Sequence, residues 1–271
     1  MMKKIVLAAL CFFSLTLHAQ KIERSKDELK SSPSQSSGNS SGSSNSSRSN
    51  YADDDNNIWL ELLFNIAFGV FKYGLIGDYT KENDLYNRLT MYPYADGFSG
   101  NYTPDSVAGK KFRIDLEDHV LYSNNNLFGN HVKAKIRPFQ YFFVQADYRE
   151  LFERRTDNTT DNLTLFHFNI AYDRIRLRHF NLGWTLGASY VGSQVRKAGF
   201  SYGLQAEYFA GKHISFSGSA KWSNINGYPV NAYEFQGRWH KKQFFASAGF
   251  QHLKIATPTY NFFTVGGGLY L

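Results

Sequence analysis

Charged side chains at every second position are the feature of this 271-residue sequence that could do chemistry. Apolar residues occupy the positions between them. Period-two spacing puts alternate side chains on one face of a β-strand, so these charges are predicted to share a face, which must meet water or pair its charges. The charges assigned to this face are Lys111, Arg113, Asp115, Glu117, Lys133, Lys135, Arg137, Asp147, Asp173, Glu207, Lys221, Glu234 and Arg238.

Two functions fit a charged face of this kind if the sheet closes into a narrow barrel. In a barrel of about ten strands, the inward side chains fill much of the interior. The favoured interpretation is an ion-paired interior that holds the barrel rigid. The alternative is a narrow pore whose basic constriction favours anions. The pairs expected between neighbouring strands join Lys133, Lys135 and Arg137 to Asp115, Glu117 and Asp147.

The same pattern offers few residues for a catalytic or metal site. His119 with Glu117 and Asp147 is a weak candidate for a hydrolase at the rim, although a histidine paired with a carboxylate is more often structural. His252 falls on the apolar face, where no serine nucleophile accompanies it. We therefore predict a protein that is not an enzyme and has no metal or cofactor. Three histidines lie on different strands and are not spaced as metal ligands: His119, His167 and His213.

The clearest strands lie at 180–190 and 200–208. Both stretches alternate strictly between apolar and small or polar residues, and they are about ten residues long, which suits a tilted strand that crosses a bilayer. Their apolar faces end on Tyr190 and Tyr208, as aromatic side chains at a membrane interface would. This pair predicts two strands of a transmembrane barrel.

The same alternation predicts ten strands in all. Connections between them alternate in length, with longer ones at 122–130, 150–162, 191–199 and 223–229. Short turns alternating with longer loops are typical of outer-membrane barrels. The predicted strands cover 111–119, 132–137, 141–148, 166–173, 180–190, 200–208, 214–222, 233–239, 244–251 and 263–271.

Aromatic residues mark both ends of the apolar faces. Such residues form girdles at the two membrane interfaces of transmembrane barrels. One girdle is expected at the outer rim and the other at the periplasmic rim. The residues assigned to the girdles are Tyr148, Tyr172, Tyr190, Tyr208, Trp222 and Trp239.

The N-terminal part divides into three segments before the barrel at 108–271. Residues 1–19 have two lysines, an apolar core and a final alanine, which is the layout of a secretory signal peptide. Residues 20–56 are rich in Ser and Asn and predict a disordered linker. Residues 57–107 combine an apolar segment, 58–75, with a turn-rich part. The apolar segment fits a helix best, although a strand is also compatible with it.

Composition is consistent with this class of protein. Aromatic residues make up 17% of the chain, and lysines and arginines are interleaved with acids. The absence of a basic stripe or recognition motif argues against nucleic-acid binding. The only cysteine, Cys11, lies in the predicted signal peptide, so the mature chain is expected to hold no disulfide.

The chain resembles the small outer-membrane β-barrel proteins of the Bacteroidota. The resemblance rests on the Ala19-Gln20 junction, the alternating strands and the final Gly-Leu-Tyr-Leu271. It implies an integral protein of the outer membrane of a Gram-negative bacterium, in contact with lipid and inserted by the barrel-assembly machinery. The expected fold is all-β, an antiparallel transmembrane barrel of about 10 strands (8–12). The expected function is a non-enzymatic structural or surface-interaction role, with an anion-preferring channel as the alternative.

Overall fold

The computed structural model describes residues 20–31, 68, 70–104, 112–124 and 126–271. The predicted signal peptide, most of the predicted linker and Lys111 lie outside these residues. Among the helices described, none has the length and apolar character needed to span a membrane.

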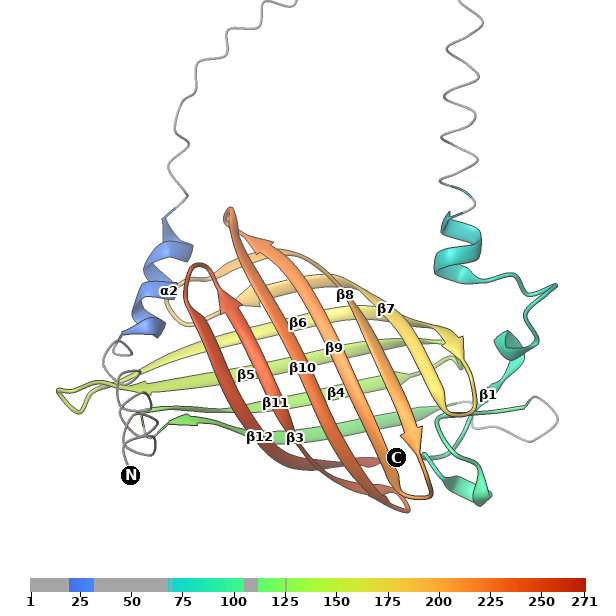
Figure 1. Cartoon of the computed structure of the whole chain (residues 1–271). Helices are drawn as coiled ribbons and strands as arrows, with labels where there is room; N and C mark the ends of the chain where they lie inside the picture. The colour runs from blue at the N-terminus through green and yellow to red at the C-terminus, as the bar shows by residue number, and fades with distance from the viewer. Residues whose placement is uncertain (1–19, 32–67, 69, 105–111, 125) are drawn as a thin grey trace, which may run out of the picture.

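Ten antiparallel strands form a closed barrel (Figure 1). Each strand from β3 to β12 pairs with the next, and the pairing of β12 with β3 closes the ring. This confirms the predicted all-β fold and its strand number. The strands are β3 (Arg113–Asn124), β4 (Leu127–Arg137), β5 (Phe142–Arg154), β6 (Thr160–Arg176), β7 (Phe180–Val191), β8 (Lys197–Ala210), β9 (Ile214–Ile225), β10 (Tyr228–Lys241), β11 (Phe244–Ile255) and β12 (Thr259–Tyr270).

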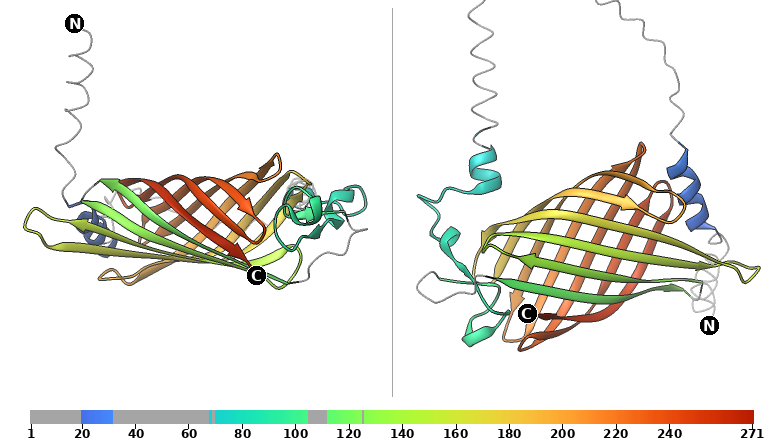
Figure 2. Two further views of the ribbon diagram at one scale, coloured as in Figure 1. Left: turned by 90° about the horizontal axis from the view of Figure 1, so that it is seen from below. Right: turned by 180° about the vertical axis from the view of Figure 1, so that it is seen from behind.

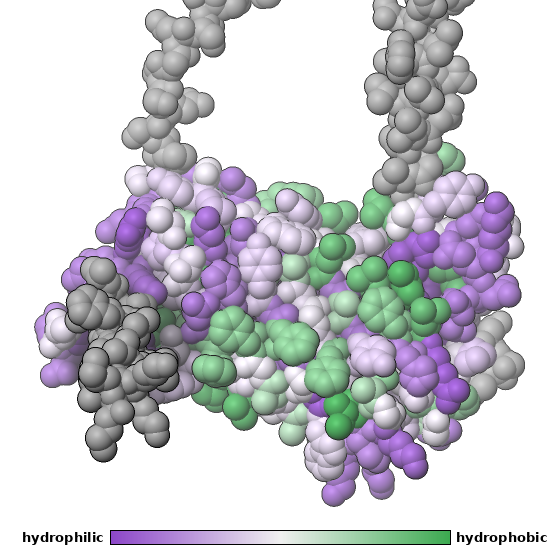
Figure 3. All heavy atoms as spheres, in the orientation of Figure 1, coloured by the Kyte–Doolittle hydropathy of each residue, from purple (hydrophilic) through white to green (hydrophobic). Residues whose placement is uncertain are grey.

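Polar residues point into the barrel and apolar residues point out of it. In β4, Lys133 and Lys135 are buried, whereas Val132 and Ile136 are each 43% exposed. Figure 3 shows apolar residues gathered along the middle of the barrel, with polar residues toward both ends. This arrangement is the reverse of a water-soluble protein and is the pattern of a barrel surrounded by lipid.

The prediction of four longer connections is wrong, because most of their residues belong to strands. In the predicted loop 150–162, β5 and β6 remain paired as far as Arg154 and Thr160. Here the pattern inverts, so that Leu151 points inward while Glu150 and Arg154 point outward. Inversion is expected where the outer face of a strand meets water. Among the described residues, the connections that remain are the one between β3 and β4 and the turns at 155–159, 192–196 and 226–227.

A helix, α2 (Lys21–Lys30), closes the end of the barrel that carries these turns (Figures 1 and 2). The prediction of a disordered linker is therefore wrong for residues 21–30, which form this helix. Ile22 and Leu29 are seven residues apart on one face of the helix and are fully buried. They pack on inward-facing apolar side chains of the barrel, including Leu121, Leu127, Leu151, Leu163, Leu165, Val191, Val195, Ile225, Val230, Leu253, Ile255, Tyr260 and Phe262.

Polar contacts fix α2 in the barrel mouth. The Glu153 carboxylate accepts hydrogen bonds from the backbone N–H groups of Ile22 (2.7 Å) and Lys21 (3.2 Å). A carboxylate at this position satisfies free donors of the first helical turn and faces the positive end of the helix dipole. The Ser25 hydroxyl donates to the carbonyl of Ile255 at 2.9 Å. The helix is thus held at its N-terminus and along its buried face.

Replacing Leu29 by alanine should loosen α2. Truncation of a fully buried leucine costs about 2–5 kcal/mol, and here the loss falls on the docking of one helix. We expect faster trypsin cleavage after Lys30, measured on folded protein in detergent. Asp27→Ala is the control, because the Asp27 side chain is 68% exposed. Equal cleavage rates for Leu29→Ala and wild type would show that α2 is not docked as described.

The chain before the barrel closes the opposite end. It contains η1 (Val70–Ile76), η2 (Asn83–Tyr86), β1 (Arg88–Leu89), η3 (Ala95–Gly97) and β2 (Tyr102–Thr103). Of the predicted apolar helix 58–75, only Phe68 and the part inside η1, a π-helix, are described. The guanidinium of Arg174 donates hydrogen bonds to Glu82, which lower the pKa of that carboxyl. This ion pair attaches the segment to β6.

The residues predicted to form the aromatic girdles differ in their exposure. Tyr148, Tyr190, Tyr208 and Trp239 are between 38% and 53% exposed on the outer wall, and Trp222 is half-buried. The expectation of lipid contact is wrong for Tyr172, which is 1% exposed. Its hydroxyl donates to the carbonyl of Ile76 at 2.9 Å, because the N-terminal segment covers the wall at this point.

Candidate functional site

The candidate functional site is the band of charged side chains inside the barrel. Lys111 lies outside the described residues, and Glu207 is half-buried. The other charges predicted for this face are all buried. The structure also places the fully buried Arg149 among them. The buried members are Arg113, Asp115, Glu117, Lys133, Lys135, Arg137, Asp147, Asp173, Lys221, Glu234 and Arg238.

One group of ion pairs lies toward the end closed by β1 and β2. Asp115 contacts Arg113 at 2.6 Å and Arg137 at 3.3 Å, and Arg137 reaches Asp173 at 2.9 Å. The hydroxyl of Tyr102, in β2, also donates to Asp173, at 2.6 Å. The N-terminal segment therefore takes part in the charge network and closes the barrel with it.

A second group joins strands that are not neighbours. Arg238 of β10 contacts Glu117 of β3 at 2.8 Å and Glu207 of β8 at 2.7 Å. Such pairs form inside the barrel, because arginine is long enough to reach strands two or three positions away in the ring. Each one ties together parts of the wall that backbone hydrogen bonds do not join directly.

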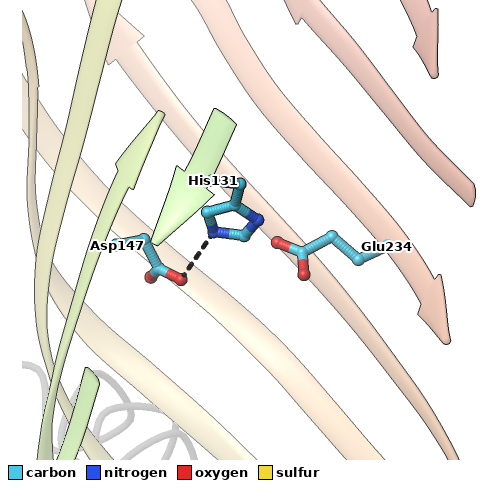
Figure 4. A group of neighbouring side chains, drawn as sticks. All are labelled: His131, Asp147 and Glu234. Atoms are coloured by element: carbon cyan, nitrogen blue, oxygen red, sulfur yellow. Dashed lines mark hydrogen bonds and ion pairs between the residues drawn. The ribbon is translucent and has the colours of Figure 1, made fainter. Parts of the chain in front are cut away.

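The third group surrounds Asp147 and Glu234 in the middle of the barrel (Figure 4). Glu234 accepts hydrogen bonds from Lys133, at 2.8 Å, and from Arg149. Asp147 accepts a hydrogen bond from Lys221 and has Lys133 at 3.9 Å. Two carboxylates are thus held by three cations in a space shielded from water.

The expected pairing of neighbouring strands accounts for only part of this network. Arg137 contacts Asp115 and Lys133 contacts Asp147, as predicted. Glu117 instead pairs with Arg238 across the interior, and Lys135 has no ion pair within 4.0 Å among the described residues. Arg149 is absent from the predicted set, because the predicted third strand, 141–148, stops one residue before it. The continued alternation of Gln145, Asp147 and Arg149 could have revealed it.

His131, Asp147 and Glu234 place their potential metal-ligand atoms within 4.8 Å of one another. The imidazole of His131 lies 3.3 Å from Asp147 (Figure 4). Lys221 and Lys133 already neutralise the two carboxylates. A metal ion would add positive charge beside these buried cations, at a large electrostatic cost. The donor set therefore fits an ion-pair network and does not fit a metal.

The three weak catalytic candidates do not form a catalytic group. His119 is hydrogen-bonded through Nε2 to the Ser247 hydroxyl at 2.9 Å, and its Nδ1 has no hydrogen-bond partner among the described residues. Glu117 is engaged by Arg238, and Asp147 by Lys221 and His131. A serine–histidine pair needs a third group that orients the histidine. The carboxylates proposed for that role are paired elsewhere.

The space left among the charges is small. A cavity of about 30 Å³ lies beside Lys135, Glu207 and Arg238. A volume of this size holds a water molecule or two and no larger solute. Helix α2 lies at one end of this network and the β1–β2 segment at the other. This arrangement can brace the barrel wall.

Comparisons with known proteins add a resemblance of shape. The chain matches no protein-family model and no curated protein sequence. It is similar to the structure of the Yersinia pestis outer membrane protein Ail in a phospholipid bilayer nanodisc, at 11% identity and a TM-score of 0.35, covering 59% of this chain and 100% of that one. It is also similar to an outer membrane channel from Pseudomonas putida F1, at 7% identity and a TM-score of 0.34, covering 61% of this chain and 97% of that one.

Proposed function

We propose that this protein is a non-enzymatic, integral β-barrel of the outer membrane of a Gram-negative bacterium, with a closed interior and a structural or surface-interaction role. The observation that carries the proposal is the reversed polarity of the barrel. The lumen buries a network of paired charges, while apolar side chains cover the exterior. A barrel with this exterior would expose a large apolar surface in water, whereas lipid covers it without cost.

The outer wall supports membrane insertion in detail. Val120, Phe263 and Val265 are 61%, 69% and 66% exposed, and they lie together on β3 and β12. The strands contain 11 to 17 residues, and about 9–11 suffice for a tilted strand to cross the hydrocarbon core. The additional length extends into water, where outward residues become polar.

The filled interior supports a closed barrel over an open pore. Every acidic residue of the central network has a basic partner within hydrogen-bonding distance, and arginine side chains fill the space between the strands. An ion would have to displace these pairs and also pass α2. The anion-preferring channel remains the alternative outcome of the test below.

The β5–β6 hairpin is the best candidate for contacts with other molecules. It projects beyond the other strands (Figure 1), and its turn at 155–159 carries exposed polar residues. Arg155 pairs with Glu23 of α2 at 2.9 Å, which fixes the base of the turn to the helix. We assign this end of the barrel to the cell exterior, where a polar projection can meet a partner.

The experiment that tests the proposal is conductance of the purified protein in a planar lipid bilayer. Insertion is verified first by heat-modifiable mobility of reconstituted protein on gels. We expect inserted protein to give no steady current. Stepwise currents that favour anions would replace the closed barrel by the channel. Protein that stays soluble without detergent and does not enter lipid would remove the membrane assignment altogether.

A further inference from the structure

Among the described residues, Lys135 is the only member of the charged band without an ion-pair partner. It lies on β4 and is 7% exposed. Its neighbour in β3 is Asp115, but that carboxylate is already held by Arg113 at 2.6 Å and by Arg137 at 3.3 Å. Its neighbour in β5 is Gln145, which carries no charge. The ammonium group of Lys135 is therefore buried without a counter-ion, which is costly inside a protein.

The charges of the band are out of balance by one. In the part of the band that the structure describes, there are seven basic side chains and six acidic ones. The surplus is one positive charge, and a singly charged anion would neutralise it. The basic members are Arg113, Lys133, Lys135, Arg137, Arg149, Lys221 and Arg238, and the acidic members are Asp115, Glu117, Asp147, Asp173, Glu207 and Glu234.

The cavity beside Lys135 is lined by hydrogen-bond donors that have no partner. Its lining includes Lys135 of β4, Ser219 of β9 and Arg238 of β10. The Ser219 hydroxyl and the Nε–H of Arg238 are buried, and neither has a hydrogen-bond partner among the described residues. Arg238 uses its two terminal nitrogens on Glu117 and Glu207. Because buried donors are nearly always satisfied, a positive charge and two free donors at one cavity indicate a site for an acceptor.

The carboxylates in the lining do not compete for these donors. Glu207, Glu234 and Asp173 each have a basic partner at 2.7–2.9 Å. The side-chain oxygen of Gln145 is an acceptor without a partner among the described residues. The ammonium group of Lys135 has three N–H donors, so it can donate to this oxygen and still contact an anion.

The size of the cavity limits the anion to a single atom. Its volume is about 30 Å³, which suits an occupant close to the size of a water molecule. A chloride ion is only slightly larger than a water molecule, whereas sulfate, phosphate and organic carboxylates are several times larger. Water fits by size, but it leaves the charge of Lys135 without a counter-ion. Chloride supplies that charge and accepts hydrogen bonds without having to donate any.

We propose that the lumen binds one chloride ion, or another halide, in the cavity beside Lys135. Its ligands are the ammonium group of Lys135, the hydroxyl of Ser219 and the Nε–H of Arg238. The ion balances the charge of the band and connects β4 to β9 and β10. It is taken up as the barrel folds, because the surrounding ion pairs enclose it. The inference rests on the closed interior of the proposed function and does not depend on insertion into a membrane.

Bromide tests the site directly by X-ray diffraction. The protein is unfolded, refolded in detergent with sodium bromide as the only halide salt, and crystallised. Diffraction is recorded at the absorption edge of bromine. We expect an anomalous difference peak in the cavity, within hydrogen-bonding distance of Lys135 Nζ. Density for water alone at this place, without an anomalous peak, would overturn the proposal.

Urea unfolding measures the same binding in solution, since urea brings no halide. The protein is refolded in chloride or in gluconate, which is too large for the cavity, at equal ionic strength. For one bound ion, the folding equilibrium constant should rise about tenfold for each tenfold rise in chloride above its dissociation constant. We expect this rise in wild type and in the control Lys212→Met, whose lysine is exposed. Lys135→Met should show no chloride dependence.

The outcomes separate the anion site from the proposed function. Equal urea midpoints of wild type in chloride and gluconate would overturn the site, as would a Lys135→Met protein with the full chloride dependence. If Lys135→Met does not fold, the bromide peak in wild type decides. Stepwise currents in a planar bilayer would remove the closed barrel. A barrel that carries no current and binds no bromide would leave the proposed function standing and overturn the anion site alone.

Discussion

Glu234→Gln should lower the free energy of unfolding by about 3–5 kcal/mol, because it leaves buried cations without a counter-ion. Glu234 is 7% exposed and accepts hydrogen bonds from Lys133 and Arg149. Glutamine keeps the size of the side chain and removes its charge. The effect is measured as the shift in urea midpoint of the heat-modifiable, folded band in detergent.

Two further variants make this prediction specific. Asp27→Asn removes an exposed ion pair with Lys30 and should change stability by about 0–1 kcal/mol. Replacing the whole group, with Lys133→Met, Arg149→Met and Glu234→Leu together, should recover most of the loss, since an apolar group carries no unpaired charge. A Glu234→Gln protein as stable as wild type would mean that the lumen is hydrated, which the closed barrel forbids.

Val265→Arg should cost about 2–4 kcal/mol in a lipid bilayer, the range for arginine at the bilayer midplane of a barrel. Val265 lies near the middle of β12, pairs with Ala248 and Val120 of the neighbouring strands, and is 66% exposed. Its side chain therefore points away from the protein. The cost is read from urea unfolding of protein folded in vesicles.

Val265→Leu is the matched control and should leave stability nearly unchanged, because leucine is also apolar. Destabilisation by both substitutions would point to tight protein packing around Val265. If Val265→Arg folds into vesicles with the stability of wild type, the outer face of β12 does not contact lipid.

The strands could be predicted from the sequence because each has a period-two pattern over most of its length. Trp184 and Leu186 alternate with small residues, and Lys133 and Lys135 alternate with aliphatic ones. Prediction failed at the α2 end of the strands. There the outward residue changes from apolar to polar, as at Glu150, while Leu151 points inward. If a strand is expected to keep apolar residues outward and polar residues inward over its whole length, the part with the opposite arrangement is mistaken for a loop.

Helix α2 could not be predicted for a different reason. Its ten residues include only two large apolar side chains, Ile22 and Leu29, and a helix this short is not stable alone. Its stability comes from docking on apolar side chains contributed by many strands. The Glu153 carboxylate that caps it is more than a hundred residues away.

The sequence predicts which residues line the candidate site, but it predicts few of the contacts between them. Alternation places Glu117, Lys133 and Arg238 on the inner face. Which charges meet depends on the width of the barrel and the stagger of its strands. Arg238 contacts Glu117 although their strands are not neighbours. Pairing rules for adjacent strands do not include such contacts.

The most direct test of a lipid-embedded barrel is the environment of a nitroxide spin label on its outer wall. Val265→Cys and Thr156→Cys, each in the Cys11→Ala background, are labelled in separate proteins reconstituted into vesicles. Collisions with oxygen report contact with lipid, and collisions with a water-soluble nickel chelate report contact with water. We predict that oxygen dominates at 265 and that the nickel chelate dominates at 156. Equal access of the nickel chelate to both labels would contradict the membrane-spanning barrel.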